Sequence, residues 1–501
     1  MYKRINETQT GMLALDISDQ PSQGLLTSSV LTALASITGT AALVGIHHYY
    51  RKRHQPDASL QDYVIGVRAQ WQVWQQAYQQ YYQETTNAPD FAALHTTTMV
   101  ARPVSWVSGV ASMPKNITGA DSSNRQLDSD FGVVGIDADR QIVWQTTMPE
   151  RVHDIVVQPS VDDLCGMQHV TQDSVKNQPL HRDVVVMGRR PSERFWVLDT
   201  ASGQVTNAIQ AVSQRHFYGH ACYSLDGKLL YVTENDTVSL DGKIGIYDAA
   251  DGYKKIAEYD AYGIGPHELI MHPDGNTLVI ANGGIKTERA SREELNLDSM
   301  RPSLVYLNRH TGALLEQVIP AHNQMSVRHL AMHDDGTVMI GIQFQGDKHI
   351  NVPLVLTHKR GDANFEPLIM PHDQWQRFHQ YIASVAVDSE HNLLCVTTPI
   401  GGCAAIYDLN TRQLIDTVSL PDCAGASMLA SQAFKEQTFK KSGSEKSGFI
   451  VSDGQGQLTT LEIQDTLASG AIDTRNTERV PHIIKDSQVH QMSFDNHLQA
   501  L

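Results

Sequence analysis

A repeating four-strand unit constrains the fold of this chain more than any other feature of its sequence. The segments HACYSLDGKLLYVTEND from His220, HELIMHPDGNTLVIANGG from His267 and HLAMHDDGTVMIGIQFQG from His329 each read as a strand, a tight turn and a second strand. Further strands, such as GKIGIYD and PSLVYLN, follow them. Asp-Gly pairs supply the positive φ that tight hairpins need. Four strands at a period of about 40–60 residues are typical of a β-propeller blade.

Similar units fill the rest of the chain after Pro103. They begin near His153, Tyr381 and Ala424, which brings the number of complete blades to six. The strands WVSGV, FGVVGID and QIVWQTTMP provide most of a seventh blade, and we expect the end of the chain to complete it. Cutting such a ring into separate domains would expose strand edges. We therefore predict an all-β, seven-bladed β-propeller over residues 103–496.

The residues before the propeller have a different character. After a tail of residues 1–24, residues 25–46 carry no charge and no proline, and a helix of about 22 residues spans about 33 Å. We predict a transmembrane anchor or an uncleaved signal there; a cleaved export signal and a buried soluble helix are the alternatives. Residues 47–101 are predicted to form a helical stalk or linker, because apolar and aromatic residues recur at helical spacing from Leu60 to Tyr81.

Charge and motifs exclude several classes of function. The chain has 39 Lys and Arg against 55 Asp and Glu, a net charge of −16, which argues against a nucleic-acid partner. Its five cysteines form no CxxC pair, so neither a zinc ribbon nor a thioredoxin-like site is indicated. The sequence also lacks the GxSxG, P-loop and HExxH patterns.

Histidine is the residue type that points to a site. Of the 23 histidines, four recur at the start of the first strand in successive blades. In a propeller this strand lines the channel, and its start lies beside the end of the second strand. Neutral imidazoles with a carboxylate suit iron, copper or zinc, so we predict a metal site at the channel mouth. The candidate ligands are His153, His216, His220, Glu234, His267, Glu268 and His329.

Two other interpretations of the channel mouth remain open. Arginines also occur at the ends of the repeats, and a guanidinium matches a carboxylate bidentately, so the mouth could instead bind an anion. Alternatively, the polar side chains serve only to satisfy water and backbone inside the channel. The candidate ligand-binding residues are Arg189, Arg190, Asn282, Arg301, Arg328, Gln343 and Gln345.

Several long motifs resemble a bacterial propeller family known as domain of unknown function 1513. They are RHFYGHACYSLDGKLLYVTEND, IGPHELIMHPDGNTLVIANGGI, LNLDSMRPSLVYL and SVRHLAMHDDGTVMIGIQFQG, and the similarity covers roughly residues 131–461 and the FDNH at 494–497. The resemblance implies an exported protein linked to iron uptake, with an imelysin-type or other iron-uptake protein as its partner. The chain departs from the family at Lys3-Arg4, where a twin-arginine pair is expected, in the added residues 47–101 and in the lysine-rich run 435–446.

Together these observations give one main expectation. The protein is a propeller in the periplasm, anchored in the inner membrane by its N-terminal helix, which binds a metal or a metal-bearing ligand and serves iron acquisition or handling. The basic residues 51–53 after the span favour a cytoplasmic propeller by the positive-inside rule, against the resemblance. A lactonase-like or quinoprotein-like enzyme and a scaffold for an iron-uptake partner are the alternatives.

Overall fold

The computed structural model describes residues 94–113, 131–159, 181–190, 192–287, 294–429, 447–467 and 479–501. All of them belong to the second of two compact units, Met1–Ala88 and Pro89–Leu501. The predicted tail, the predicted anchor or signal, and the predicted stalk up to residue 93 lie outside the described residues. Within the described ranges, no helix is long and apolar enough to cross a membrane.

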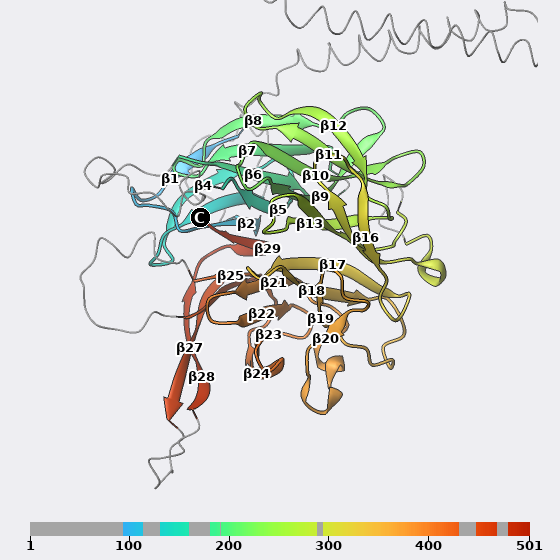
Figure 1. The fold of residues 1–501 in the computed structure, drawn as a ribbon. Coiled ribbons are helices and arrows are strands. Elements are labelled where there is room, and N and C mark those ends of the chain that lie inside the picture. The colour runs from blue at the N-terminus through green and yellow to red at the C-terminus, as the bar shows by residue number, and fades with distance from the viewer. Residues whose placement is uncertain are drawn as a thin grey trace, which may run out of the picture. The chain divides into compact units, whose positions relative to one another are not determined.

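Seven antiparallel sheets form the described part of the chain, which confirms the predicted all-β, seven-bladed propeller (Figure 1). Six sheets are meanders of four consecutive strands. The first three of these are β5 (Val152–Val157), β6 (Asp183–Gly188), β7 (Arg194–Asp199) and β8 (Val205–Gln210); β9 (Arg215–Tyr223), β10 (Leu229–Asp236), β11 (Gly242–Asp248) and β12 (Lys254–Asp260); and β13 (Pro266–Met271), β14 (Thr277–Asn282), β15 (Ser303–Asn308) and β16 (Leu314–Val318).

The next three meanders continue the same plan around the ring. They are β17 (Met325–Met332), β18 (Thr337–Phe344), β19 (Val355–Lys359) and β20 (Glu366–Pro367); β21 (Ser384–Asp388), β22 (Leu393–Thr398), β23 (Cys403–Asp408) and β24 (Gln413–Ser419); and β25 (Cys423–Met428), β26 (Ser447–Asp453), β27 (Gln457–Leu467) and β28 (Arg479–Val489). Short 3-10 helices connect some strands: η2 (Leu297–Ser299), η3 (Pro371–Asp373) and η4 (Trp375–Phe378).

The remaining blade joins the two ends of the propeller. Its strands are β1 (Thr96–Thr98), β2 (Trp106–Ser112), β3 (Gly132–Ile136), β4 (Ile142–Thr147) and β29 (Ser493–Ala500), in the spatial order β1-β4-β3-β2-β29. β29 therefore supplies the innermost strand of a blade whose other strands come from the start of the domain, as expected. β1 precedes residue 103, and β29 continues past residue 496.

The first strand of each blade faces the centre of the ring. β29, β5, β9, β13, β17, β21 and β25 each contact the next, and β25 contacts β29, so the inner strands form a closed circle around one axis. Tight turns lead out of these strands, and Gly227 and Gly275 of two Asp-Gly turns have φ of +66°, the conformation that the sequence predicts. The starts of all inner strands consequently lie at one end of the channel.

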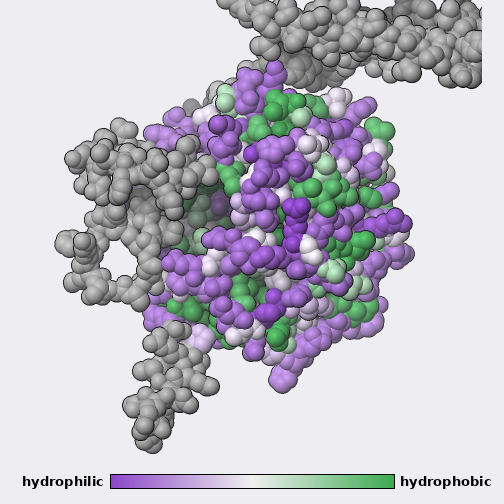
Figure 2. Space-filling model, viewed as in Figure 1, coloured by the Kyte–Doolittle hydropathy of each residue, from purple (hydrophilic) through white to green (hydrophobic). Residues whose placement is uncertain are grey.

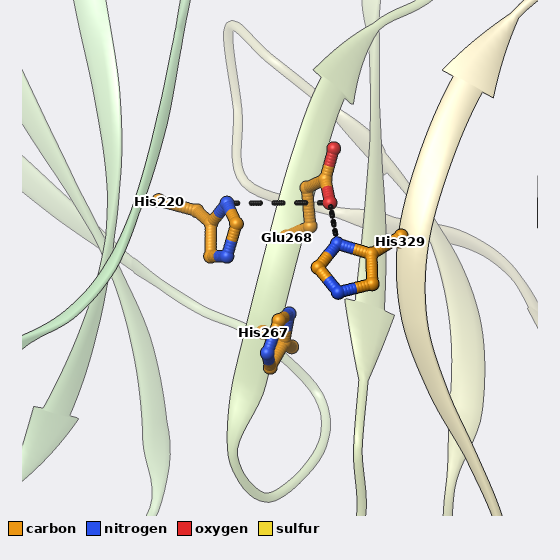
Figure 3. Close-up of side chains that lie close together, drawn as sticks. All are labelled: His220, His267, Glu268 and His329. Carbon is orange, nitrogen blue, oxygen red and sulfur yellow. Dashed lines mark hydrogen bonds and ion pairs between the residues drawn. The ribbon is translucent and has the colours of Figure 1, made fainter. Parts of the chain in front are cut away.

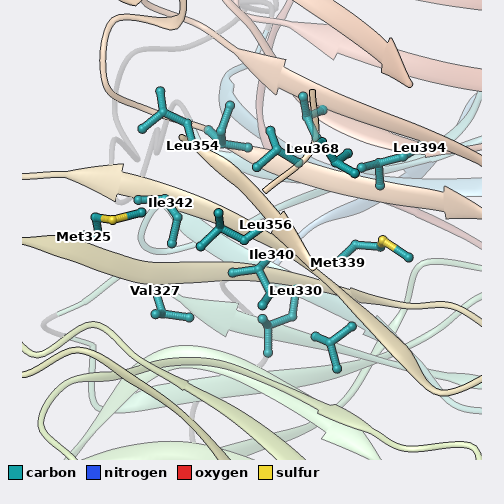
Figure 4. Packing of buried hydrophobic residues seen from close by; sticks show 14 of the residues in the cluster. Met325, Val327, Leu330, Met339, Ile340, Ile342, Leu354, Leu356, Leu368 and Leu394 are labelled. Carbon is teal, nitrogen blue, oxygen red and sulfur yellow. The ribbon is translucent and has the colours of Figure 1, made fainter. Parts of the chain in front are cut away.

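Aliphatic side chains of the middle strands fill the space between blades. All six residues of β14 are buried, whereas β12 and β16 are largely exposed at the outer edge. Figure 4 shows Ile340 and Ile342 of β18 packed with Leu354 and Leu356 in the largest of these clusters. Figure 2 shows hydrophilic residues over much of the visible outer face, with apolar residues in separate patches.

One hairpin departs from the compact outline of the ring. β27 and β28 pair along eleven residues each and project from the body of the propeller (Figure 1). The lysine-rich run 435–446 falls between β25 and β26, outside the described residues.

We predict that ring closure depends on the apolar side chains of β29. Phe494 and Leu498 are 3% and 4% exposed and pack on Trp106 and Val110 of β2. Phe494→Ala should lower the free energy of unfolding by about 3–5 kcal/mol, as for other buried phenylalanines. Urea unfolding followed by tryptophan fluorescence measures the change. Val238→Ala, at a side chain that is 73% exposed, is the control and should stay within about 0.5 kcal/mol of the parent.

Candidate metal centre

Five histidines enter the channel from the inner strands of five neighbouring blades. They are His497 on β29, His153 on β5, His220 on β9, His267 on β13 and His329 on β17. Four of them are the blade-start histidines that the repeat predicts. The closed circle of inner strands brings these residues together although they are spread over more than 300 positions of the sequence.

A β-bulge in each of the five strands that carry these histidines turns their side chains toward the axis. The pairing register shifts between Val152 and Ile155 on β5, between Pro266 and Glu268 on β13, and between Val327 and His329 on β17. Comparable shifts occur where β10 faces β9 and where β2 faces β29. A β-bulge breaks the alternation of side chains and re-aims one of them, and bulges are common beside functional sites.

A glycine lets two of the strands approach closely at this level. Gly219 on β9 has a φ of +110°, and a Cβ placed there would lie 2.4 Å from Cδ2 of His153. The residue before His220 therefore has no room for a side chain, and the His153 ring occupies that space.

The other four imidazoles pack around His220. Its ring centroid lies 4.6 Å from that of His153, 4.7 Å from that of His267 and 5.0 Å from that of His497. The centroids of His267 and His329 are 4.9 Å apart. Figure 3 shows that His220, His267 and His329 surround a common space, with the Glu268 carboxylate between His220 and His329.

Two carboxylates contact the Nδ1 atoms of three of these histidines. Oε2 of Glu268 lies 3.0 Å from Nδ1 of His329. Oδ2 of Asp154 lies 3.3 Å from Nδ1 of His220, and its Oδ1 lies 3.5 Å from Nδ1 of His497. A carboxylate at Nδ1 favours the tautomer with its proton on that atom, which leaves the Nε2 lone pair free. Histidines that bind metals have such carboxylate partners in many proteins.

Several ring nitrogens of this cluster lack hydrogen-bond partners. Nε2 of His220, His329 and His497 and Nδ1 of His267 are buried, and none has a hydrogen-bond partner among the described residues. Nδ1 of His220 is close to Asp154 at 3.3 Å, but it forms no hydrogen bond with it. An unsatisfied buried polar atom costs about 1–3 kcal/mol, and native structures contain few. Four such nitrogens in one cluster fit a site for a ligand that accepts imidazole lone pairs.

Burial and the two carboxylates divide the protons unevenly. Burial lowers the pKa of His153, His267 and His329 well below the usual range, and that of His497 to about 3. Burial is also the largest single influence on His220, but the nearby carboxylates of Asp154 and Glu268 together outweigh it and raise that pKa. Burial raises the pKa of Glu268 to about 8. In the metal-free cluster these shifts favour a proton on His220 and on Glu268, and they favour the neutral form of the other four imidazoles.

Two of the predicted metal ligands lie elsewhere. Glu234 accepts hydrogen bonds from the Tyr247 hydroxyl at 2.7 Å and the Lys255 ammonium at 2.6 Å inside its blade, so it does not join the histidines. His216 is buried and stacks on Tyr218 at 6.2 Å between ring centroids. Burial and the charge of Arg190 lower the pKa of His216 to about 4.

The cluster contains two residues that the sequence analysis did not name as ligands. Asp154 follows His153 as Glu268 follows His267, so a repeated His-acid pair was the available signal. His497 ends the FDNH motif of the family resemblance. The usual repeat signal, an Asp-Gly turn and a second strand, does not follow it, because the other strands of its blade come from the start of the domain.

Arginines and tyrosines lie at the same end of the channel as the histidines. Arg328 sits in the bulge of β17 beside His329, and its charge helps to lower the pKa of His267. Arg189 follows β6 and has the same effect on His153. Arg190 donates hydrogen bonds to the Tyr218 hydroxyl and, at 3.2 Å, to Thr287.

The other predicted ligand-binding residues have structural or surface positions. Nδ2 of Asn282 donates to the Ala261 carbonyl at 2.9 Å, and Gln343 forms a backbone bridge to Tyr381. The backbone N–H of Gln345 donates to the Gln324 carbonyl at 2.9 Å. Arg301 is exposed just before β15.

Comparisons with known proteins identify one family and two distant structural similarities. A model of the family described as "Protein of unknown function (DUF1513)" matches residues 172–501. Hydrazine synthase of Kuenenia stuttgartiensis is similar with a TM-score of 0.45 and 14% identity, over 64% of this chain and 86% of that one. A chain of a mitotic checkpoint complex is similar with a TM-score of 0.39 and 13% identity, over 56% and 70%. No curated protein matches the sequence.

We predict that the metal-free protein loses stability as the pH falls below about 6.5. Unfolding lets His153, His267, His329 and His497 take up protons that burial denies them in the folded state, because their folded pKa values lie below the ordinary 6.5. Glu268 acts in the opposite sense above pH 4.5, and His220 is protonated in both states below pH 6.5. These groups should therefore make the free energy of unfolding fall by up to about 4 kcal/mol per pH unit, and the lowered pKa of His216 acts in the same direction.

Urea unfolding in the presence of a chelator, from pH 7.5 to pH 5, measures this dependence. His267→Gln is the matched variant and should reduce the slope by about 1.4 kcal/mol per pH unit, since one proton fewer is taken up on unfolding. An unchanged slope in this variant would contradict the burial of a neutral His267.

Proposed function

The chain belongs to the family described as "Protein of unknown function (DUF1513)", and we propose that it binds one divalent transition-metal ion in its channel through His220, His267 and His329. The observation that carries this proposal is the set of buried imidazole nitrogens that lack a partner among the described residues. Imidazole nitrogens bind iron, copper, zinc and nickel, whereas magnesium and calcium prefer oxygen ligands.

The spacing of the donor atoms supports an ion at this position. One donor atom from each of His220, His267, Glu268 and His329 lies within 4.8 Å of the others. Ligands of a tetrahedral ion with bonds of about 2.0–2.1 Å are about 3.4 Å apart. A small inward movement of the side chains would therefore complete the site, without a change in the strands.

The carboxylates have a defined part in this proposal. Glu268 and Asp154 hold Nδ1 of His329 and His220 so that Nε2 of each ring points to the ion, and they balance its charge. Three imidazole ligands leave a coordination position open, as in zinc enzymes with three histidines. The raised pKa of His220 favours its doubly protonated ring, and the ion must displace the proton on Nε2, so metal uptake would release protons.

A second group of candidate metal ligands shares His220 with the first group. His153, His220 and His497 also offer donor atoms within 4.8 Å of one another. In our proposal His153 and His497 flank the ion and exclude water from it, because both rings pack directly on His220.

The biological setting that we propose follows the family resemblance. The protein would work in the periplasm, anchored in the inner membrane by residues 25–46, and would serve iron acquisition or handling with an imelysin-type or other iron-uptake protein. Metal binding and this setting are separate proposals, and they have separate tests.

We predict one metal ion per chain in protein purified without a nickel column. Elemental analysis gives the stoichiometry, and thermal unfolding with added Fe²⁺, Cu²⁺ or Zn²⁺ gives the response. An ion at 100 times its Kd stabilises the folded state by about 2.7 kcal/mol. Glu268→Gln should weaken binding by about 10–100-fold, as for other carboxylates behind a ligating histidine, and His329→Gln should weaken it further.

His333→Gln is the matched control for these variants. His333 lies in the same blade as His329, but its Nδ1 and Nε2 contact Asp335 and Asn392 at the surface. The control should bind metal like the parent. Absence of stoichiometric metal, together with unchanged thermal stability in all three ions, would remove the proposed metal centre.

We predict that a reporter enzyme active only in the periplasm is active when fused after residue Glu84. The resemblance to an exported family is the reason for this orientation. Activity of the fusion in intact cells is the measurement, and a reporter active only in the cytoplasm, fused at the same position, is the control. The reverse pattern would put the propeller in the cytoplasm, as the positive-inside rule favours.

A further inference from the structure

We propose that the channel takes up a small organic anion, whose carboxylate contacts both the metal ion and the guanidinium of Arg328. This inference rests on the proposed metal centre and names the class of ligand that completes it. It concerns the open coordination position that three imidazoles leave on the ion.

Arg328 is the residue that carries the inference. It occupies the bulge of β17, directly before His329, and its residue surface is largely buried. Its Nε donates a hydrogen bond to Oγ of Ser326 at 3.1 Å, and that hydroxyl donates to the Gly283 carbonyl at 2.9 Å. Ser326 therefore fixes the inner edge of the guanidinium, and its two terminal nitrogens have no hydrogen-bond partner in the part of the chain that the structure describes, so they can bind another group.

No Asp or Glu among the described residues forms an ion pair with Arg328. The carboxylates closest to the channel have other partners: Asp495 forms a bidentate pair with Arg151 at 2.6 and 2.8 Å, and Glu268 bonds His329. Glu294 raises the pKa of Arg328 by its charge, but it is exposed and lies beyond ion-pair distance. Burial of a cation without a compensating anion is costly, and it lowers the pKa of Arg328.

Other donors and cations surround the same position. Tyr218, Tyr381 and Arg190 contribute to the electrostatic surroundings of Arg328. Arg190 lies over the Tyr218 ring, 4.6 Å from its centroid, and donates a hydrogen bond to its hydroxyl, so the Tyr218 side chain is fixed. The Tyr381 ring lies 6.4 Å from that of His329. Tyr381 is thus placed beside a metal ligand, and Tyr218 is held in place by Arg190.

The balance of charge makes the ligand an anion. Once the ion has displaced the protons of His220 and Glu268, its two positive charges offset the charges of Asp154 and Glu268, and neutral imidazoles add none. The positive charge of Arg328 then has no counterpart in the cluster. A guanidinium with two free terminal nitrogens matches the two oxygens of a carboxylate, and the phenol hydroxyls can donate to the same group.

The test uses the full-length protein loaded with Co²⁺, whose visible spectrum reports a change in its ligands. Oxalate is the probe, with inorganic phosphate as the competing oxyanion. In the parent protein we expect oxalate to change the Co²⁺ spectrum at lower concentration than phosphate does. Arg328→Gln should weaken oxalate binding at least tenfold. The same variant should bind Co²⁺ as tightly as the parent or more tightly, because a cation beside the ion has been removed.

Arg301→Gln is the matched control, since Arg301 is an exposed arginine of the neighbouring blade, and it should behave like the parent. Arg328→Lys keeps the charge without the planar pair of donors and should give intermediate oxalate affinity, which serves if Arg328→Gln does not fold. Equal oxalate affinity in the parent and the folded Arg328 variants, or tighter binding of phosphate, would overturn the inference while leaving the metal centre intact. A parent protein with no Co²⁺ spectrum before oxalate is added would overturn the metal centre and the bridged anion together.

Discussion

The pairing of β29 with β2 is the interaction on which the rest of the molecule depends. It joins the last described strand to the first blade, and the inner strands then form a closed circle with no free edge. This circle, rather than any local motif, brings His153, His220, His267 and His329 together. It also brings in His497, which β29 itself carries. The pairing that holds the ring together and the cluster in its channel therefore share one strand.

The histidine cluster is energetically unfavourable as a purely structural core. Propeller channels can be filled with water and small polar side chains, yet here five imidazoles pack within a few ångströms of one another and most are held neutral by burial. Asp154 and Glu268 are positioned at Nδ1 atoms, and Nε2 of His220, His329 and His497 has no hydrogen-bond partner among the described residues. A metal ion would satisfy these nitrogens at once. Arg328, directly before His329 on β17, would in turn bind an anion beside the ion.

The fold could be predicted from local sequence signals. The composition of the site could not, because it depends on which side chains of a strand face the channel. Asp-Gly turns and short apolar runs are local, so they predicted the blades and their closure. Whether a residue near a strand end faces the channel depends on bulges, and these leave no clear mark in the sequence. Glu234 shows the effect: it lies near the predicted end of its strand, but its side chain points into the blade toward Tyr247 and Lys255. Asp154 and His497 show the opposite effect, because they were not predicted but belong to the cluster. A bulge in β5 brings Asp154 there, and the pairing of β29 with β2 brings His497 there.

The position of His497 has a consequence for how the channel is completed during synthesis. β29 leaves the ribosome after every other strand of the propeller, yet it supplies one wall of the histidine cluster and the innermost strand of the first blade. A nascent chain can fold blade after blade, but its channel stays open on one side until these final residues arrive. Assembly of the cluster therefore depends on the whole propeller: a chain that ends before β29 would contain His220, His267 and His329 but would lack the strand that closes the channel around them.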